Sequence, residues 1–477
     1  NAQLEVSTSG LPARLIAGLK RLATFANPKF YELQRLRFPT YKTPRFIFCG
    51  EIHPDRLVLP RGVLDEAIKL VEKAGAKVVV NDLRPSAEPA AFEFQGVLTR
   101  AQREAVKVCA AHEEGVLMAP AGAGKTVMGC ALIAQRQTRT LVLTHRRPLL
   151  EQWKSQLIRF LGLKKRGVRV LSGKGGFRPG SLDLGMFQTL VRMENAAEVL
   201  SQYGHVVIDE CHHVPAVSFE AVLKACSARY ILGLTATPTR KDGLQKILFM
   251  QCGPVRHEMK DRGDARIERK VLVRRVSFKL VHDSERPPIH LVWEAMVNDG
   301  ERTDQIVNDV AGAVAKGRRS LVLSDRKQHL LSLQEKLASK LSGADVAIFK
   351  LESGTGQKER KRVLEEARQR FSEGMGCVLL ATSSLIGEGF DLPQLDTLFL
   401  AMPLSFKGRL IQYAGRLHRS FEGKRDVLIY DYIEPANALT MSMHRKRLIA
   451  YRQMGYRVET QSSASEQWLF HPGAAAP

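Results

Sequence analysis

The chain has 477 residues, of which 72 are Lys or Arg and 49 are Asp or Glu, so its formal net charge is +23. Its hydrophobic content of 44% and charged content of 25% are typical of globular domains and exclude a wholly disordered chain. The sequence holds no apolar run of the roughly 18 residues that a membrane-spanning helix needs. At roughly 150 residues per domain, the length predicts about three domains. The basic excess predicts a polyanionic partner, above all nucleic acid; a basic protein without such a partner is the alternative.

Seven scattered cysteines without a CxxC pair indicate neither a disulfide framework nor a zinc ribbon. Cys211, His212 and His213 are adjacent, a spacing at which side chains rarely converge on one metal, and we interpret them as non-ligands. Since no secretory signal is visible, a cytoplasmic location is expected.

Residues 1–89 are expected to form a small α/β module. Between residues 5 and 45 it carries eight basic residues against Glu5 and Glu32, a balance suited to phosphate contact. Aromatic residues interleave with these cations and could stack on bases, although core packing is the expected role for most of them. These aromatic residues are Phe25, Phe30, Tyr31, Phe38 and Tyr41. The hydrophobic pattern predicts helical segments at 11–37 and 63–74 and strands at 45–48, 56–59 and 77–80.

Short apolar strands then alternate with helices twice, over 90–255 and again over 293–477. This alternation is typical of parallel sheets built from right-handed crossovers. Residues 256–292, rich in mixed charge, are expected to connect the halves, with strands possible at 270–273 and 276–280. The clearest strands of the first half are predicted at 116–119, 140–143, 205–208 and 230–234. In the second half we expect strands at 320–323, 346–349, 377–381 and 397–400 and helices at 293–316, 328–341 and 357–371.

A loop of small residues joins strand 116–119 to the next helix. Gly122 and Gly124 let successive backbone N–H groups face a phosphate at the positive helix N-terminus. Lys125 can reach the β- and γ-phosphates of a nucleotide, and the Thr126 hydroxyl can bind Mg²⁺. The loop therefore predicts an ATP site.

Two carboxylates follow strand 205–208, which we expect to lie beside this loop. Asp209 is suited to hold Mg²⁺, and Glu210 to orient or deprotonate the attacking water. An Asp-Glu pair alone is weak evidence, but its place after a buried strand and downstream of a phosphate loop makes this interpretation strong.

With these residues in place, the sequence resembles superfamily 2 helicases. Asp209-Glu210-Cys211-His212 is similar to their DExH box. Trp153 and the Arg240-Lys241-Asp242 stretch make the resemblance closest to XPB-like helicases and translocases, with Lys241 in place of an acid. The other helicase motifs follow in order at 98–102, 141–147, 187–190, 234–238, 321–325, 382–391 and 412–419.

The resemblance implies two RecA-like parallel-sheet domains in tandem, preceded by a small α/β accessory domain that engages nucleic acid. ATP and Mg²⁺ are the implied cofactors, and Arg416 and Arg419, three residues apart on one helix face, would supply guanidinium groups to the phosphates. The expected catalytic residues are Lys125, Asp209, Glu210, Arg416 and Arg419. The nucleotide is expected to contact Gln102, Gly122, Gly124, Lys125, Thr126, Gly389 and Asp391, with Mg²⁺ at Thr126 and Asp209. Nucleic acid is expected at Arg146, Gln188, Thr189, Thr382 and Ser383, and Thr235, Thr237 and Gln412 are expected to couple the two activities.

The leading hypothesis is an ATP-dependent helicase or translocase acting on DNA, whether single-stranded, forked or duplex, with RNA as the alternative substrate. A remodelling or annealing motor without strand separation remains open. A third possibility is an ATP-switched scaffold for a partner nuclease or primase. Two further basic stretches are candidates for the nucleic-acid track: residues 152–182, which hold eight cations and no acid, and the cluster Arg445, Lys446, Arg447 and Arg452.

Overall fold

The computed structural model divides into two compact units, residues 1–261 and 262–477, which are described separately below. The residues described are 3–120, 122–171, 179–213, 216–236, 243–259, 267–278, 288–352, 354–386, 390, 392–404, 407–418, 421 and 423–461. No helix in these ranges is long and apolar enough to cross a membrane.

The first unit is built on a seven-stranded sheet in which every neighbouring pair of strands is parallel. Such a sheet is covered on both faces, so its strands are apolar on both sides. Across the sheet the strands are β12 (Val255–Glu258), β6 (Glu114–Met118), β11 (Tyr230–Thr235), β10 (His205–Asp209), β7 (Thr140–Thr144), β9 (Leu182–Met186) and β8 (Arg169–Val170).

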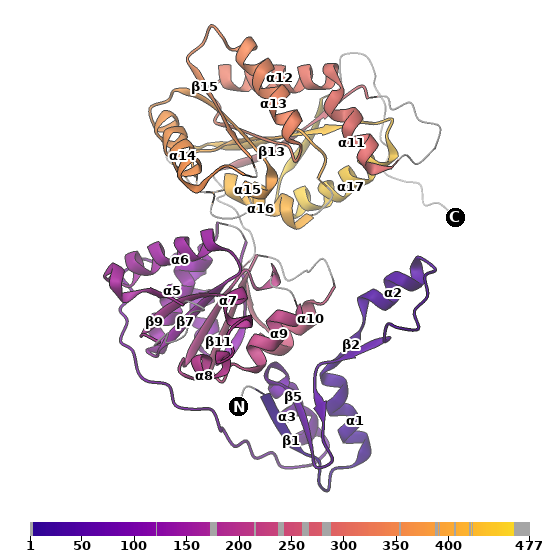
Figure 1. Ribbon diagram of the computed structural model, residues 1–477, viewed down its shortest axis with the longest axis vertical. Coiled ribbons are helices and arrows are strands. Elements are labelled where there is room, and N and C mark those ends of the chain that lie inside the picture. Colours follow the sequence, from indigo (N-terminus) through magenta and orange to yellow (C-terminus); the bar gives the residue numbers. More distant parts are fainter. Residues whose placement is uncertain are drawn as a thin grey trace. The chain divides into compact units, whose positions relative to one another are not determined.

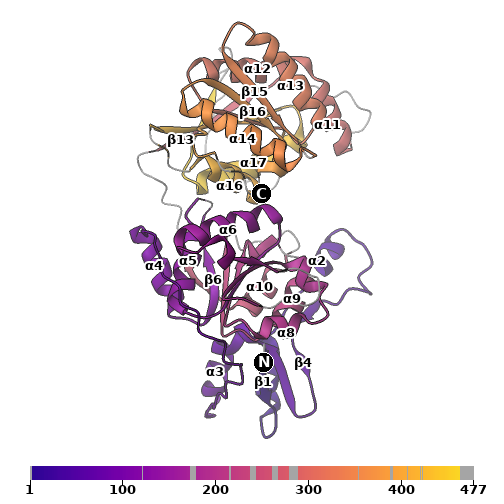
Figure 2. The same ribbon diagram turned by 60° about the vertical axis from the view of Figure 1, so that its left-hand side comes forward.

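Helices cover both faces of this sheet (Figures 1 and 2). Val142 and Val207 pack into one buried cluster, whereas their neighbours Leu141 and Val206 pack into the other. This alternation is the two-residue period of a strand that is buried on both sides. The first face is covered by α4 (Arg100–Ala110), α5 (Lys125–Arg136) and α6 (Arg147–Phe160). The second is covered by α7 (Phe187–Val191), α8 (Ala196–Ser201), α9 (Ala216–Lys224) and α10 (Gln245–Cys252).

The N-terminal module belongs to the same unit and packs on α10. Its core extends into the first half through Ile247 and Met250. Arg61 donates to the Glu114 carboxylate at 2.6 Å and to the Ala228 carbonyl at 2.8 Å, which ties the module to the sheet. The module holds an antiparallel sheet of β1 (Gln3–Ser7), β5 (Arg56–Pro60) and β4 (Glu51–Ile52), with helices α1 (Ala13–Leu22) and α3 (Leu64–Lys73).

Residues 24–48 form a separate extension of this module, which we call the arm (Figure 1). Strands β2 (Thr24–Ala26) and β3 (Phe46–Phe48) pair antiparallel at its base, and α2 (Pro28–Arg35) follows β2. The helix expected at 11–37 is therefore interrupted. The physical reason is Asn27, which caps α2 by accepting from the Lys29 N–H at 3.1 Å, followed by a proline in the first turn.

The second unit repeats the architecture with another seven-stranded, fully parallel sheet. Its strands, across the sheet, are β15 (Val346–Leu351), β16 (Gly376–Ala381), β14 (Ser320–Leu323), β17 (Thr397–Leu400), β18 (Asp426–Ile433), β13 (Glu268–Arg275) and β19 (Arg457–Gln461). Helices α12 (Gly300–Ala315) and α13 (Lys327–Lys340) cover one face, and α14 (Gln357–Ser372), α16 (Lys407–Leu417) and α17 (Ala438–Gln453) cover the other. The remaining helices are α11 (Ile289–Asn298) and α15 (Ser383–Ile386).

The expected fold, two parallel α/β halves behind a small α/β module, is confirmed. The buried strand expected at 77–80 is wrong, because within the described ranges no strand pairs with these residues and Val79 is 75% exposed. Within 256–292, expected to connect the halves, β13 lies inside the second sheet between β18 and β19. Val276–Phe278 is not a strand, and the rest of the expected strand 276–280 lies outside the described residues.

Candidate nucleotide-binding site

The expected phosphate loop lies between the C-terminal end of β6 and the N-terminus of α5. Gly122 and Gly124 have φ angles of 87° and 85°, which glycine adopts without strain. A Cβ atom on Gly124 would also lie 2.5 Å from Nε2 of Gln102, so a side chain there would displace the Gln102 amide from its place beside the loop. The helix begins at Lys125, and the first N–H groups of a helix, which have no partner within it, can bind an anion at this end.

Lys125 and Glu210 are brought together although they are far apart in sequence. The Lys125 ammonium lies 3.1 Å from Glu210 Oε1 and 3.3 Å from the Ala119 carbonyl oxygen. Both side chains are largely buried, which strengthens their attraction relative to a surface pair. The lysine expected to bind phosphate is therefore paired with the glutamate expected to activate water.

Asp209 ends β10 and is buried beside this pair. Its Oδ1 accepts from the Glu210 N–H at 3.0 Å, and its Oδ2 accepts from the Trp153 indole N–H at 2.8 Å. Burial and the neighbouring Glu210 carboxylate raise the pKa of Asp209 to about 6, while Lys125 and Trp153 act in the opposite direction. Glu210 itself has a φ of 46°, a strained backbone conformation of the kind that gathers at functional sites.

The hydrogen bond from Trp153 was not expected from the sequence. Trp153 lies in α6, which begins directly after Arg146, and its ring packs on α5, where a Cβ on Gly129 would be only 2.7 Å from Cη2. Helix α6 therefore begins next to Arg146, an expected nucleic-acid contact, and carries Trp153, which donates to the carboxylate expected to hold Mg²⁺. A signal was present, because a fully buried Trp needs an acceptor for its N–H.

Replacing Trp153 with Phe should impair catalysis through Asp209. The variant keeps an aromatic ring against Gly129 but removes the donor to Oδ2. Loss of such a supporting hydrogen bond weakens metal affinity or activity by roughly 10- to 100-fold. We expect the Mg²⁺ concentration for half-maximal ATP hydrolysis to rise. The matched control is Trp293→Phe in α11 of the second unit; equal Mg²⁺ dependence in the two variants would contradict the assignment.

Gln102 connects α4 to the phosphate loop. Its side-chain oxygen accepts from the Thr99 N–H at 2.9 Å and its amide nitrogen donates to the Ala123 carbonyl at 2.9 Å. Thr99 and Gln102 also form a capping box at the start of α4. Gln102 therefore supports the loop directly, and its expected contact with the nucleotide stays a prediction.

Thr235, from the expected coupling motif, is connected to Glu210 through His212. The Thr235 hydroxyl lies 2.7 Å from His212 Nδ1, and this nitrogen lies 3.4 Å from Glu210 Oε2. From the sequence, His212 is expected only to be a non-ligand of metal and the last residue of the DExH-like stretch. Its imidazole therefore lies between the Glu210 carboxylate and the hydroxyl of Thr235, at the end of β11.

Three expected nucleic-acid contacts gather at the C-terminal ends of the neighbouring strands β7 and β9. Arg146 is exposed at the N-cap of α6, after β7. Gln188 and Thr189 are in α7, which follows β9 directly, and Gln188 donates to the His145 carbonyl at 3.0 Å. The parallel sheet therefore brings these residues to one edge.

In the second unit the expected contacts Thr382 and Ser383 are buried, at 4% and 3% exposed. Asp325 accepts from both the N–H and the hydroxyl of Ser383, and the Tyr413 hydroxyl donates to the Ser383 carbonyl at 3.1 Å. Arg416 lies in the last turn of α16. Thr237, Gly389, Asp391, Arg419 and the side chain of Gln412 lie outside the described residues.

The late basic cluster needs one correction. Arg447 is only 3% exposed and lies 2.8 Å from an Asp431 oxygen, while it also donates to the Leu404 carbonyl at 3.1 Å. It is therefore part of the core and unavailable for a phosphate backbone. Arg445, Lys446 and Arg452 are exposed and keep that role as a prediction.

The residues at the nucleotide site suit ATP with Mg²⁺. Mg²⁺ prefers oxygen donors and is usually held by one or two carboxylates together with substrate phosphates. Asp209 would supply the carboxylate, and Thr126, next to Lys125 in the first turn of α5, would supply a hydroxyl. The described residues contain no cluster of three His, Cys, Asp or Glu side chains that could hold a metal.

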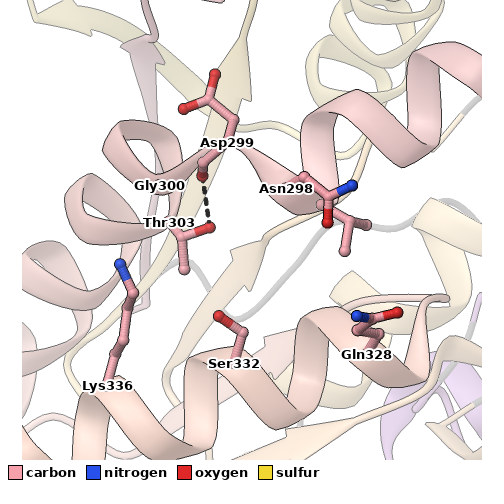
Figure 3. A pocket seen from close by; sticks show the side chains of 8 residues that line it. Asn298, Asp299, Gly300, Thr303, Gln328, Ser332 and Lys336 are labelled. Atoms are coloured by element: carbon pink, nitrogen blue, oxygen red, sulfur yellow. Dashed lines mark hydrogen bonds between the residues drawn. The ribbon is translucent and has the colours of Figure 1, made fainter.

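A pocket of about 260 Å³ lies in the second unit between the α11–α12 junction and α13 (Figure 3). Its charged groups already have partners: Asp299 accepts from the Arg302 N–H at 2.9 Å, and Lys336 pairs with Asp304 at 2.6 Å. The Thr303 hydroxyl donates to the Asp299 carbonyl at 2.8 Å. We assign this pocket no ligand.

Two sequence families match the chain. Residues 93–240 match "Type III restriction enzyme, res subunit", and residues 302–421 match "Helicase conserved C-terminal domain". "Probable helicase D10" of Escherichia phage T5 is 26% identical over 348 residues, which are 72% of each chain. "DNA 3'-5' translocase XPB2" of Sulfurisphaera tokodaii is 20% identical over 376 residues, covering 72% of this chain and 83% of that protein.

Among solved structures, a fragment of a putative HsdR subunit of a type I restriction enzyme from Vibrio vulnificus YJ016 is similar in fold. Its TM-score is 0.57 at 17% identity, and the match covers 83% of this chain and 74% of that one. Together with the two parallel sheets, this likeness is consistent with RecA-like domains in tandem.

Proposed function

We propose that this helicase-type, ATP-dependent enzyme of nucleic acids is a motor that moves along DNA. The proposal starts from its similarity to superfamily 2 helicases. The observation that carries this proposal is the constellation of Lys125, Glu210 and Asp209, with Trp153 connecting it to the helix that begins after Arg146.

The pairing of Lys125 with Glu210 suggests how binding ATP prepares catalysis. Phosphate oxygens of ATP compete with the single Glu210 carboxylate for the Lys125 ammonium. Once Lys125 turns to the phosphates, Glu210 loses its cation and its carboxylate becomes available to accept a proton from water. The site is therefore expected to gain its base only when the nucleotide is present.

Mg²⁺, when bound, would neutralise charge on the phosphates, held by the Thr126 hydroxyl and Asp209. The chain's own residues would do the rest: Trp153 and the Glu210 N–H orient Asp209, and His212 connects Glu210 to Thr235. Arg416 and Arg419 of the second unit are proposed to supply guanidinium groups, an effect worth roughly 10³–10⁵ in rate in related phosphoryl transfer.

DNA is the proposed track because a relative that resembles the chain over most of its length is called a DNA translocase, and because the chain carries a net charge of +23. Arg146, Gln188 and Thr189 would contact the backbone, which positions the protein without reading sequence.

The decisive experiment measures ATP hydrolysis with single-stranded DNA, duplex DNA, forked DNA and RNA as stimulators. We expect DNA to stimulate hydrolysis more than RNA of equal length, and raised salt to weaken the effect. Stimulation by RNA alone would overturn the choice of substrate. Strand displacement compared with triplex displacement then separates a helicase from a remodelling or annealing motor. Low turnover with tight binding of a nuclease or primase would favour the scaffold.

A further inference from the structure

The arm exposes aromatic side chains that the core does not use. Of the five aromatics expected mainly in the core, Phe25 is buried, but Tyr31, Phe38 and Tyr41 are 38%, 59% and 81% exposed. Phe46, at the base of the arm, is 54% exposed as well. Several large apolar side chains exposed along one short segment are more typical of an interaction site than of a folding requirement.

Cations accompany these rings. Residues 28–48 contain five basic residues and the single acid Glu32, which pairs with Lys29 at 3.0 Å. The Lys42 ammonium lies 5.4 Å from the centre of the Tyr41 ring, and the Arg45 guanidinium lies 5.6 Å from that of Phe46. Rings flanked by cations favour a partner that offers flat apolar surfaces and negative charge together, which is the chemistry of nucleic acid.

The base of the arm has fixed contacts within the first unit. Asn27 is buried, caps α2 and donates to the Pro44 carbonyl at 2.8 Å, which holds the two ends of the arm together. Pro28 lies against Gly243, where a Cβ atom would be 2.7 Å from the proline Cγ. Gly243 is in the connection between β11, which ends at the coupling residue Thr235, and α10. The start of α2 therefore contacts Gly243, in the connection that precedes α10.

We propose that the arm binds the unpaired bases of a single nucleic-acid strand, with Phe38 and Tyr41 as stacking platforms and the neighbouring cations on the phosphates. Bases inside a duplex are stacked on one another and hide their faces, so rings of this kind engage only unpaired bases. The inference rests on the proposed function and adds the form of substrate that the N-terminal module selects. A protein partner is the other possible occupant, and the interleaved cations argue against it.

The test compares wild type with the double variant Phe38→Ala/Tyr41→Ala. Binding is measured by fluorescence anisotropy to an oligothymidylate of about 20 nucleotides, to an abasic strand of equal length and to a matched duplex. We expect the variant to bind oligothymidylate at least about 10-fold more weakly than wild type. Its affinity for the abasic strand should equal that of wild type, because a strand without bases offers nothing to stack.

Two controls keep this result interpretable. Phe38→Tyr/Tyr41→Phe retains both rings and should bind like wild type, and Ile52→Ala removes an exposed apolar residue of the same module outside the arm. Thermal unfolding checks that each variant folds. Two outcomes would overturn this inference but not the proposed function. One is that the alanine variant binds oligothymidylate as tightly as wild type, as expected of a protein-docking surface. The other is that it loses affinity for the abasic strand to the same degree. A wild-type protein that binds none of the three strands overturns the proposed function as well.

Discussion

Lys125→Ala is expected to lower ATP hydrolysis by at least about 10²–10³-fold, the usual effect of removing one group that stabilises transition-state charge. The ammonium is carried by the first turn of α5, where the phosphates are proposed to bind. Its removal also breaks the 3.1 Å ion pair with the largely buried Glu210. Nucleotide affinity should therefore fall together with turnover.

Nucleic-acid binding should be retained in this variant. Arg146, Gln188 and Thr189, the expected contacts, follow strands β7 and β9 and not the phosphate loop. The measurements are phosphate release with DNA present and anisotropy of a labelled DNA strand without ATP. Lys107→Ala, at an exposed position of α4, is the matched control and should behave as wild type. Normal hydrolysis by the Lys125 variant would show that the site has been assigned to the wrong residues.

The parallel strands were the part of the fold most readily predicted from the sequence. The strands expected at 320–323 and 397–400 coincide with β14 and β17, because a strand covered on both faces must be apolar without interruption. The triple valine at 78–80 shows the same pattern, but no strand in the described part of the chain pairs with it, and Val80 is 54% exposed. Pairing depends on distant parts of the chain, which a local pattern does not contain. Strand β8, which lies at the edge of its sheet and is exposed, was missed because it lacks a continuous apolar run.

The candidate site was predictable where chemistry is carried by short motifs. The loop with Lys125 and the Asp209-Glu210 pair were found from spacing and strand context alone. The supporting contacts were not, because they join residues distant in sequence: Trp153 donates to Asp209 across 56 positions. Similarly, the exposure of Tyr41 depends on where the arm leaves the module, and an alternation of aromatic and basic residues is compatible with either core or surface.

Glu210→Gln should separate nucleotide binding from hydrolysis. We expect turnover to fall by roughly 10²–10⁴-fold, the contribution of a general base. An amide has nearly the same shape, and its oxygen can still accept from Lys125, so the loop should keep its structure. Because the Glu210 charge raises the pKa of Asp209, its removal makes the ionised form of Asp209 easier to maintain. ATP affinity should therefore be retained or increased, in contrast to the loss expected for Lys125→Ala.

The distinction between the two variants tests the proposed exchange of Lys125 from Glu210 to the phosphates. The measurements are equilibrium binding of a fluorescent ATP analogue and single-turnover hydrolysis, with Glu104→Gln, at an exposed position of α4, as the control. If Glu210 serves only to hold Lys125 in place, the glutamine variant, whose amide oxygen can still accept from Lys125, will keep both ATP affinity and hydrolysis close to wild type. If Glu210 is the base that ATP releases, its variant will bind ATP and stall before hydrolysis. The glutamine variant should also remain bound to DNA in the presence of ATP, because its nucleotide-bound state persists.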